Sequence, residues 1–225
     1  MLLCFASRHV TPPQLQATFL DVGQADAAVL ELPGGQVVVI DAGEAPRSTG
    51  EGPVSSYLRR RGHKRIDLLV ASHPHPDHLG GLPALLERFS VGHMWSAGGS
   101  HPFSAAGERP DPALAQALAI AARRGVPVTP PTPLSLGEVT IDPLWPCARD
   151  RLGACVLSPE TGLRHNDTSL VLRVSYADRA LLLPGDLELP GELALLEQHD
   201  SELKGLRADV LKAPHHCSRT SSSAS

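Results

Sequence analysis

Four side chains that can bind a metal ion lie within six residues, in the stretch His73-Pro-His-Pro-Asp-His78. Three imidazoles suit zinc or manganese, and one carboxylate offers a harder or bridging contact. The two interleaved prolines cannot continue a sheet ladder and hold the segment extended, so His73 and His75 can project in similar directions. Asp77 and His78 then reach a neighbouring point, a geometry that suits two adjacent metal ions. The alternative is a surface loop that is rich in histidine by chance, and the spacing H-x-H-x-D-H argues against it.

The flanking residues place this stretch at the carboxyl end of a strand. The apolar run of residues 66–71 precedes it and predicts a buried strand. Leu79-Gly80-Gly81 follows it, where we expect a helix to begin.

The first half of the chain alternates strands with helices. Pro33-Gly34-Gly35 predicts a hairpin turn, and Gly62 and Gly125 are placed to end helices. The expected strands are residues 14–21, 26–32, 36–41, 66–71 and 91–95, and the expected helices are 52–61, 82–89 and 112–124, the last capped by Asp111.

The second half repeats this order. We expect a hairpin around Gly137 and an irregular loop over residues 147–164. Strands are expected at residues 168–176, 180–183 and 208–212, and a helix at 188–199. Two halves of strands followed by helices predict an α/β fold, in the broad sense of α+β, with two mixed sheets face to face and helices outside.

Composition favours one domain. A chain of 225 residues, 42% of them hydrophobic, can bury a two-layer core. We expect a short N-terminal segment over residues 1–13 and one domain over 14–225, with no transmembrane span, because the apolar opening is too short. The net charge of −4, without a basic block, excludes a strongly cationic nucleic-acid surface. The four cysteines lack C-x-x-C spacing and do not decide a compartment.

Several stretches in addition to H-x-H-x-D-H resemble one branch of the metallo-β-lactamase superfamily, the hydrolase domain of ComEC-type DNA-internalisation competence proteins. They occur in the expected order: Phe19-Leu-Asp-Val-Gly-Gln-Ala-Asp26, Val39-Ile-Asp-Ala-Gly43, Ser72 to Gly81, Asn166-Asp-Thr-Ser-Leu-Val-Leu172, Leu183-Pro-Gly-Asp186, and Lys212-Ala-Pro-His-His-Cys-Ser-Arg-Thr-Ser-Ser-Ser223. The resemblance implies an αββα sandwich whose metal ligands lie on loops along one edge.

The resemblance also implies ligands for two divalent metal ions, zinc or manganese. His73 and His75 would hold the first ion, and Asp77 and His78 the second. Asp186 would bridge the two, with a turn-forming aspartate as the alternative, and His215 would complete the second site. His216 competes with His215, because the sequence does not show which imidazole points inward.

A further ligand histidine of the superfamily stands four residues before a serine, and His165 has this offset from Ser169. The competence branch often lacks that histidine, so Asn166 or Asp167 is the alternative.

Asp41 is expected to orient the cluster from behind the ligands, as carboxylates do around metal-bound imidazoles. Asp21, Gln24 and Asp26 have either this role or a turn-forming one.

Two metal ions about 3.5–4 Å apart would generate a bridging hydroxide near neutral pH that attacks phosphorus in line. We therefore expect a phosphodiesterase, by resemblance a nuclease linked to DNA uptake, with Asp77, His78 and Asp186 as its catalytic residues. DNA and a membrane DNA-uptake channel are the expected partners. The substrate-binding candidates are Ser218, Arg219 and Thr220, whose hydroxyls and guanidinium suit a phosphate; a polar flexible tail is the alternative.

Three departures from the branch favour a second hypothesis. Ala25 and Cys217 stand where the branch usually has glycine, so a position that needs unusual backbone angles would carry a side chain. The chain ends at Ser225, where family members continue. The alternative function is therefore a catalytically weak metal-binding module left by truncation. Hydrolysis of a thioester or lactam is disfavoured by the resemblance to the competence branch.

Overall fold

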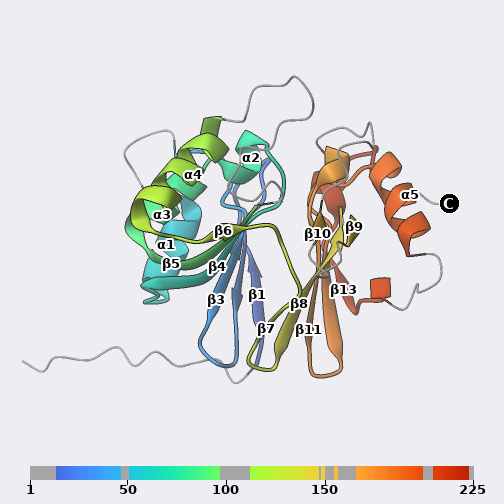
Figure 1. The fold of residues 1–225 in the computed structure, drawn as a ribbon, viewed down its shortest axis with the longest axis horizontal. Helices are drawn as coiled ribbons and strands as arrows, with labels where there is room; N and C mark the ends of the chain where they lie inside the picture. The colour runs from blue at the N-terminus through green and yellow to red at the C-terminus, as the bar shows by residue number, and fades with distance from the viewer. Residues whose placement is uncertain are drawn as a thin grey trace, which may run out of the picture.

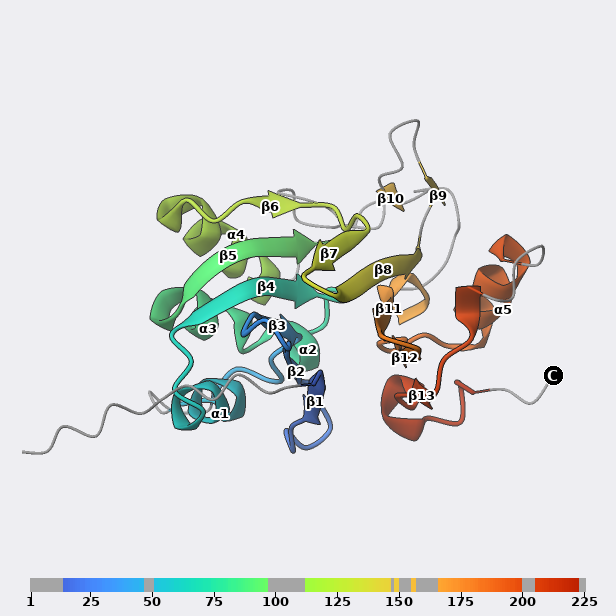
Figure 2. The same cartoon turned by 90° about the horizontal axis from the view of Figure 1, so that it is seen from below.

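The computed structural model describes residues 14–46, 51–96, 112–146, 148–149, 155–156, 166–199 and 205–222. Within these ranges two sheets face each other, and helices cover the outer face of each (Figures 1 and 2). The αββα sandwich expected from the sequence is therefore confirmed. The expected N-terminal segment, the cap Asp111, and Cys4 and Cys147 lie outside the described residues.

The first sheet has six strands in sequence order. They are β1 (Gln16–Phe19), β2 (Ala28–Glu31), β3 (Val37–Ile40), β4 (Arg65–Ala71), β5 (Ser90–Ser96) and β6 (Val128–Thr129). The first three form an antiparallel meander, and β3 to β6 run parallel. Helices α1 (Pro53–Arg60), α3 (Leu82–Arg88) and α4 (Pro112–Arg124) lie against its outer face (Figure 1). Because β3 and β4 are parallel neighbours, the loops after them meet at one edge of the sheet, and this edge carries the site.

The second sheet has the order β13-β12-β11-β8-β7. Its strands are β7 (Leu134–Leu136), β8 (Val139–Trp145), β11 (Val171–Tyr176), β12 (Arg179–Leu183) and β13 (Val210–Leu211), and the short pair β9 (Ala148–Arg149) and β10 (Cys155–Val156) stands apart. Helix α5 (Leu189–Gln198) covers its outer face (Figure 2). None of the helices in the described part of the chain has the length and apolar character to cross a bilayer.

Two layers of apolar side chains build the first half and join it to the second. One fills the space between the sheets with alternate residues of both, such as Leu30, Val70, Ile141 and Leu172. The other packs α1, α3 and α4 onto the first sheet. This burial leaves the loops at the strand ends to carry the polar side chains of the site.

The expected strand at residues 168–176 begins later than the sequence suggested. A 3-10 turn, Asn166–Thr168, precedes β11, which starts at Val171. The turn buries Asp167, whose carboxylate accepts the Gly191 N–H in the first turn of α5 at 2.9 Å. This hydrogen bond ties the 3-10 turn to α5, so residues 166–168 do not continue the strand.

Candidate metal centre

The stretch His73 to His78 forms a tight loop and one helical turn at the end of β4. His75 is the N-cap residue of the short helix α2 (Pro76–Leu79), and Pro76 is its first residue. Proline suits this first position, because its missing N–H would have no partner within the helix there. The His73 ring lies 4.7 Å from the His75 ring and 4.0 Å from the His78 ring, measured between centroids. The structure thus gathers the three imidazoles of the stretch into one cluster.

The glycine pair after the stretch allows this loop to pack on the loop that follows β3. A Cβ on Gly80 would lie 2.2 Å from the Ala45 nitrogen, and one on Gly81 would lie 2.4 Å from the Ala42 oxygen. The Ala42 N–H donates to the His78 carbonyl at 2.8 Å across the same contact. Backbone therefore lies directly on backbone here, which brings Asp41 close to the histidines.

Asp41 holds the His78 imidazole from behind. Its carboxylate accepts the Ser72 N–H at 2.9 Å and the Ser72 hydroxyl at 2.6 Å, and lies 2.8 Å from Nδ1 of His78. Burial disfavours the charged imidazolium, but the carboxylates of Asp41 and Asp186 outweigh it and raise the pKa of His78 to about 10 in the metal-free protein. With Nδ1 held by Asp41, Nε2 faces the centre of the cluster.

Asp186 lies at the middle of the cluster and comes from the second sheet. Gly185 before it has a φ of 59°, and a Cβ there would lie 3.0 Å from that of Ser169, so both conformation and space require glycine. The Asp186 carboxylate lies within 4 Å of four ring nitrogens: Nε2 of His78 at 3.1 Å, His216 at 3.6 Å, His215 at 3.8 Å and His73 at 3.9 Å. Burial raises the pKa of Asp186, but the imidazoles, that of His78 above all, hold it below its ordinary value.

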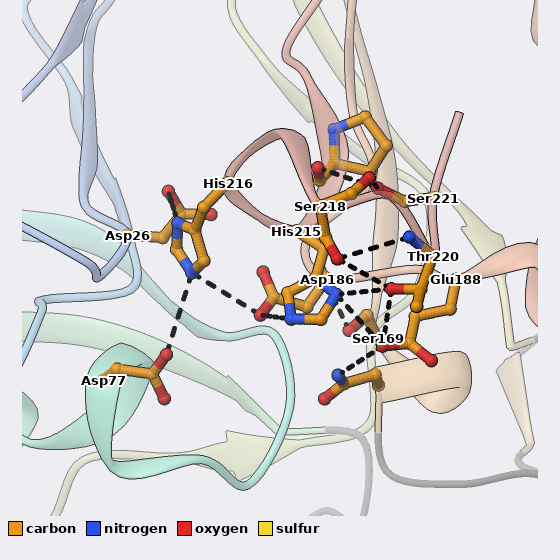
Figure 3. Close-up of polar contacts among 12 residues, drawn as sticks. Asp26, Asp77, Ser169, Asp186, Glu188, His215, His216, Ser218, Thr220 and Ser221 are labelled. Carbon is orange, nitrogen blue, oxygen red and sulfur yellow. Dashed lines mark hydrogen bonds and ion pairs between the residues drawn. The ribbon is translucent and has the colours of Figure 1, made fainter. Parts of the chain in front are cut away.

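Both His215 and His216 turn toward Asp186 (Figure 3). They belong to the turn Pro214–Cys217, in which three consecutive residues have positive φ: His215 at 43°, His216 at 50° and Cys217 at 64°. Nε2 of His216 also lies 3.7 Å from the Asp77 carboxylate, whereas Nδ1 of His215 lies 3.0 Å from that of Glu188. The structure thus places both imidazoles at the centre and keeps both as candidate ligands.

One set of donor atoms is compact enough to surround a single ion. Atoms of Asp26, His78, Asp186 and His216 all lie within 4.8 Å of one another. Asp26 comes from the loop between β1 and β2, and its carboxylate accepts a hydrogen bond from the Lys212 ammonium. Burial raises the pKa of Asp26, although Lys212 acts in the opposite direction.

The buried atoms at the centre fit a divalent cation. Nε2 of His78, Nε2 of His216 and Oδ1 of Asp186 are buried and make no hydrogen bond with any described residue, although the first and last of these atoms are 3.1 Å apart. Leaving such atoms unpaired is unfavourable, and a cation at the centre would satisfy all three. Imidazole nitrogens with carboxylate oxygens are donors that suit zinc or manganese.

The other expected site residues have varied positions. His165 lies outside the described residues. Of its alternatives, Asp167 is engaged with α5, and Asn166 donates to Glu188 at 3.1 Å. Asp21 accepts the Gly23 N–H at 3.3 Å and so forms a turn.

The candidate substrate residues follow the histidines directly. Ser218 and Thr220 are joined through their hydroxyls at 2.8 Å, and Thr220 donates to Glu188 at 3.1 Å, whereas Arg219 is exposed. Ser221 is buried and its hydroxyl lies 3.2 Å from the Pro214 carbonyl, so it closes the turn from within.

Of the two positions where a side chain replaces the branch's usual glycine, only one has left-handed backbone. Cys217 has a φ of 64°, whereas the φ of Ala25 is not positive. Cys217 is exposed and, within the described part of the chain, unpaired.

Sequence reasoning did not select Glu188 or Ser72. Glu188 stands two residues after Asp186 and just before a helix, which is the one local signal that could have identified it.

Comparison with known proteins finds one matching family and similar bacterial proteins. A family model described as the Metallo-beta-lactamase superfamily matches residues 20–225. ComE operon protein 3 of Bacillus subtilis (strain 168) is 28% identical over 222 residues, which cover 92% of this chain and 26% of that protein. Uncharacterized protein YcaI of Escherichia coli (strain K12) is 26% identical over 226 residues, covering 99% of this chain and 25% of that protein. The chain thus spans about a quarter of the length of these relatives.

Among solved structures, the chain is similar to MEM-A1, a subclass B3 metallo-beta-lactamase isolated from a soil metagenome library. The TM-score is 0.52 at 15% identity, and the match covers 93% of this chain and 82% of that one. At this identity the likeness concerns the fold alone.

Proposed function

The chain belongs to the metallo-β-lactamase superfamily of metal-dependent hydrolases, and from this we propose that it is a phosphodiesterase that cleaves DNA with two divalent metal ions. The observation that carries the proposal is the position of Asp186. Its buried carboxylate lies with Oδ2 3.9 Å from Nε2 of His73 and with Oδ1 3.1 Å from Nε2 of His78. A carboxylate whose two oxygens lie near different imidazoles suits a bridging ligand.

The two groups of ligands correspond to two sites. We assign His73 and His75 to the first ion. The second ion would be held by His78, Asp77 and an imidazole of the turn Pro214–Cys217, with Asp186 shared. Asp41 holds His78 in the orientation that such a site needs.

When bound, divalent ions supply a hydroxide nucleophile near neutral pH and stabilise the negative charge that develops on phosphate oxygens. The protein's own residues orient the reacting groups. Asp186, kept ionised by the surrounding imidazoles, would balance the charge at the centre. Ser218 and Arg219, which follow the histidines directly, would hold a phosphate of the substrate at the mouth of the site.

DNA is proposed as the substrate because the chain resembles ComEC-type competence proteins, in agreement with the match to ComE operon protein 3. Association with a membrane DNA-uptake channel is part of the same proposal. The net charge of −4 gives no general attraction for nucleic acid, so local cations next to the site must provide it.

Metal content and DNA cleavage, measured on the same sample, test the proposal. We expect elemental analysis of metal-reconstituted protein to find two ions per chain, with chelator-sensitive cleavage of single-stranded DNA. His75→Ala and Asp186→Ala should abolish cleavage. One ion or none, without cleavage in excess manganese or zinc, would contradict the proposal and favour a metal-binding module without catalytic activity. Faster hydrolysis of a lactam or thioester than of DNA would reject the substrate class.

Substitution of Arg219 tests the substrate site separately. Arg219→Ala should raise the KM for DNA roughly two- to fivefold, because an exposed guanidinium contributes about 1 kcal/mol or less to binding a phosphate, and should leave the metal content unchanged. Arg207→Ala is the matched control, since Arg207 is also exposed but precedes β13 at the far end of the second sheet. Equal effects of both substitutions on KM would indicate a general loss of charge.

A further inference from the structure

Glu188 gathers three polar groups at the start of α5. It is the N-cap residue of the helix, and one of its oxygens, Oε1, receives all three contacts (Figure 3). Nδ1 of His215 lies 3.0 Å from this atom, the Thr220 hydroxyl donates to it at 3.1 Å, and the Asn166 amide donates to it at 3.1 Å. The carboxylate thus links the turn that carries His215 to the helix that follows Asp186.

The contact between Glu188 and His215 has the same form as the contact between Asp41 and His78. In both pairs a carboxylate oxygen lies at Nδ1, at 3.0 Å and 2.8 Å, and Nε2 faces Asp186. A carboxylate oxygen can only accept a hydrogen bond, so a ring proton is assigned to Nδ1, and Nε2 is the nitrogen left to bind a metal ion. This is the arrangement in which an imidazole binds a metal ion with a carboxylate behind it.

His215 depends on such support more than His78 does. The His215 side chain is 25% exposed, whereas that of His78 is fully buried. The backbone of His215 is in the left-handed region, with a φ of 43°, and is held there by the hydrogen bond from its N–H to the Gly185 carbonyl at 3.1 Å, so the ring is the part left to be positioned. Without Glu188 the ring could rotate toward solvent, and its ordering on metal binding would then reduce the affinity.

We propose that Glu188 is the positioning residue of His215, which it holds with Nε2 toward Asp186 as a ligand of one of the two metal ions. The inference rests on the proposed two-metal function. Thr220 is part of the same support, because its hydroxyl donates to Glu188 and lies 3.4 Å from Nδ1 of His215. Glu188 acts through His215 and touches neither metal nor substrate.

Metal titration of three variants tests this role. Metal-free protein is titrated with Zn²⁺ against a chromogenic chelator. Glu188→Ala should weaken the site that His215→Ala also weakens, by about ten- to hundredfold, and leave the other site unchanged. Glu188→Gln, whose amide oxygen still accepts at Nδ1 but carries no charge, should weaken it about two- to tenfold. Glu192→Ala is the matched control: Glu192 lies one turn further along α5 and binds the Ser222 N–H at 2.6 Å, so it holds the same segment without contact to the imidazole.

A double-mutant cycle separates positioning from a structural role. In a His215→Ala background, Glu188→Ala should have no further effect on Zn²⁺ affinity. Additive effects, equal effects of Glu188→Ala and Glu192→Ala, or an unchanged affinity of the site that His215→Ala weakens would overturn the inference. Should Glu188→Ala fail to fold, an unchanged affinity of that site in Glu188→Gln would overturn it equally.

A readout without metal distinguishes failure of this inference from failure of the proposed function. In metal-free protein, nitrogen NMR of the His215 ring should show the proton on Nδ1 in the wild type and a mixture of tautomers in Glu188→Ala. A wild type that binds fewer than two ions would contradict the proposed function. A His215 ring with its proton on Nε2, or one that Glu188→Ala does not alter, would overturn the inference.

Discussion

The turn Pro214–Cys217 shows how backbone conformation and chemistry meet in single residues. His215 and His216 can both face Asp186 because each has a left-handed backbone, so that two consecutive side chains turn to the same side. For residues other than glycine this conformation costs roughly 1–2 kcal/mol. The turn is maintained by contacts with neighbouring segments, including the hydrogen bonds from the His215 N–H to the Gly185 carbonyl at 3.1 Å and from the Ser221 hydroxyl to the Pro214 carbonyl at 3.2 Å.

Cys217 carries this cost without a visible contribution to the site, since it is exposed and has a φ of 64°. Cys217→Gly should raise the free energy of unfolding by about 0.5–1 kcal/mol, because relief of the left-handed strain exceeds the added flexibility of glycine in the unfolded chain. Urea unfolding measures the change. Cys217→Ala is the control, as it removes the thiol but keeps Cβ, and a gain as large as that of glycine would show that the thiol, not the backbone, was responsible.

His78 makes metal binding dependent on pH. The pKa of His78 is raised from 6.5 to about 10 in the metal-free protein. The proton on His78 therefore stabilises the metal-free native state fully below pH 6.5, and this stabilisation is lost as the pH rises through about 10. A metal ion must displace the proton. We expect the affinity of the second site to rise about tenfold per pH unit between roughly pH 7 and 9.

Calorimetry in two buffers of different ionisation enthalpy would detect about one proton released per ion at pH 7. Asp41→Asn removes the charge that raises the pKa of His78 and should flatten the dependence; asparagine tolerates the left-handed backbone at this position, where φ is 59°. Binding without proton release at pH 7 would contradict the prediction.

The residue types that the structure gathers at the centre were predictable from the sequence because few side chains bind metals, and here four of them lie within six residues. The orientation of His215 and His216 was not predictable, since it depends on the φ values of one turn. Glu188 was missed for a related reason: its role appears only when Thr220 and Asn166, distant in sequence, lie against it.

At the scale of elements, the packing of α2 against the loop after β3 positions Asp41 behind His78. Gly80 is essential for this contact, because a Cβ at this position would lie 2.2 Å from the Ala45 nitrogen. Gly80→Ala should therefore destabilise the protein by roughly 3 kcal/mol, as backbone at 2.2 Å cannot yield as a side chain does. Thermal unfolding of the metal-free protein measures this effect.

Gly34→Ala is the control for that prediction. The atoms nearest to a Cβ on Gly34 belong to the side chain of Gln36, at 2.4 Å, which can rotate away, so the change should stay within about 0.5 kcal/mol. Similar losses for the two substitutions would show that glycine flexibility, and not close packing, determines the effect at Gly80.

Most elements followed from hydrophobic periodicity and turn residues. Pro33-Gly34-Gly35 does join the antiparallel strands β2 and β3, and Gly62 and Gly125 follow α1 and α4 with positive φ. The turn Asn166–Thr168 did not follow, because the alternation of residues 168–176 predicts a strand that begins at Thr168. Its conformation depends on Gly191 and on the Trp145 indole, which donates to the Asp167 carbonyl at 2.7 Å.

At the scale of the molecule, the centre joins the two halves of the sandwich. The first half contributes His73, Asp77 and His78, and the second contributes Asp186 and the turn Pro214–Cys217. The halves also meet through the ion pair of Lys212 with Asp26 and the hydrogen bond from the Leu170 N–H to the Ser72 carbonyl at 2.9 Å. A cation bound between the halves therefore stabilises the native state of the whole domain.

Removal of metal should consequently lower the Tm of the entire domain in one transition. At a free metal concentration about 100 times the Kd, one ion stabilises the native state by about 2.7 kcal/mol, which corresponds to roughly 5–10 °C for a domain of this size. Calorimetric scans with and without chelator measure the shift. Asp186→Asn, which weakens the shared ligand between the halves, should show a much smaller shift. A chelator effect of equal size in that variant, or two separate transitions in the wild type after chelation, would indicate that the ions stabilise one half alone.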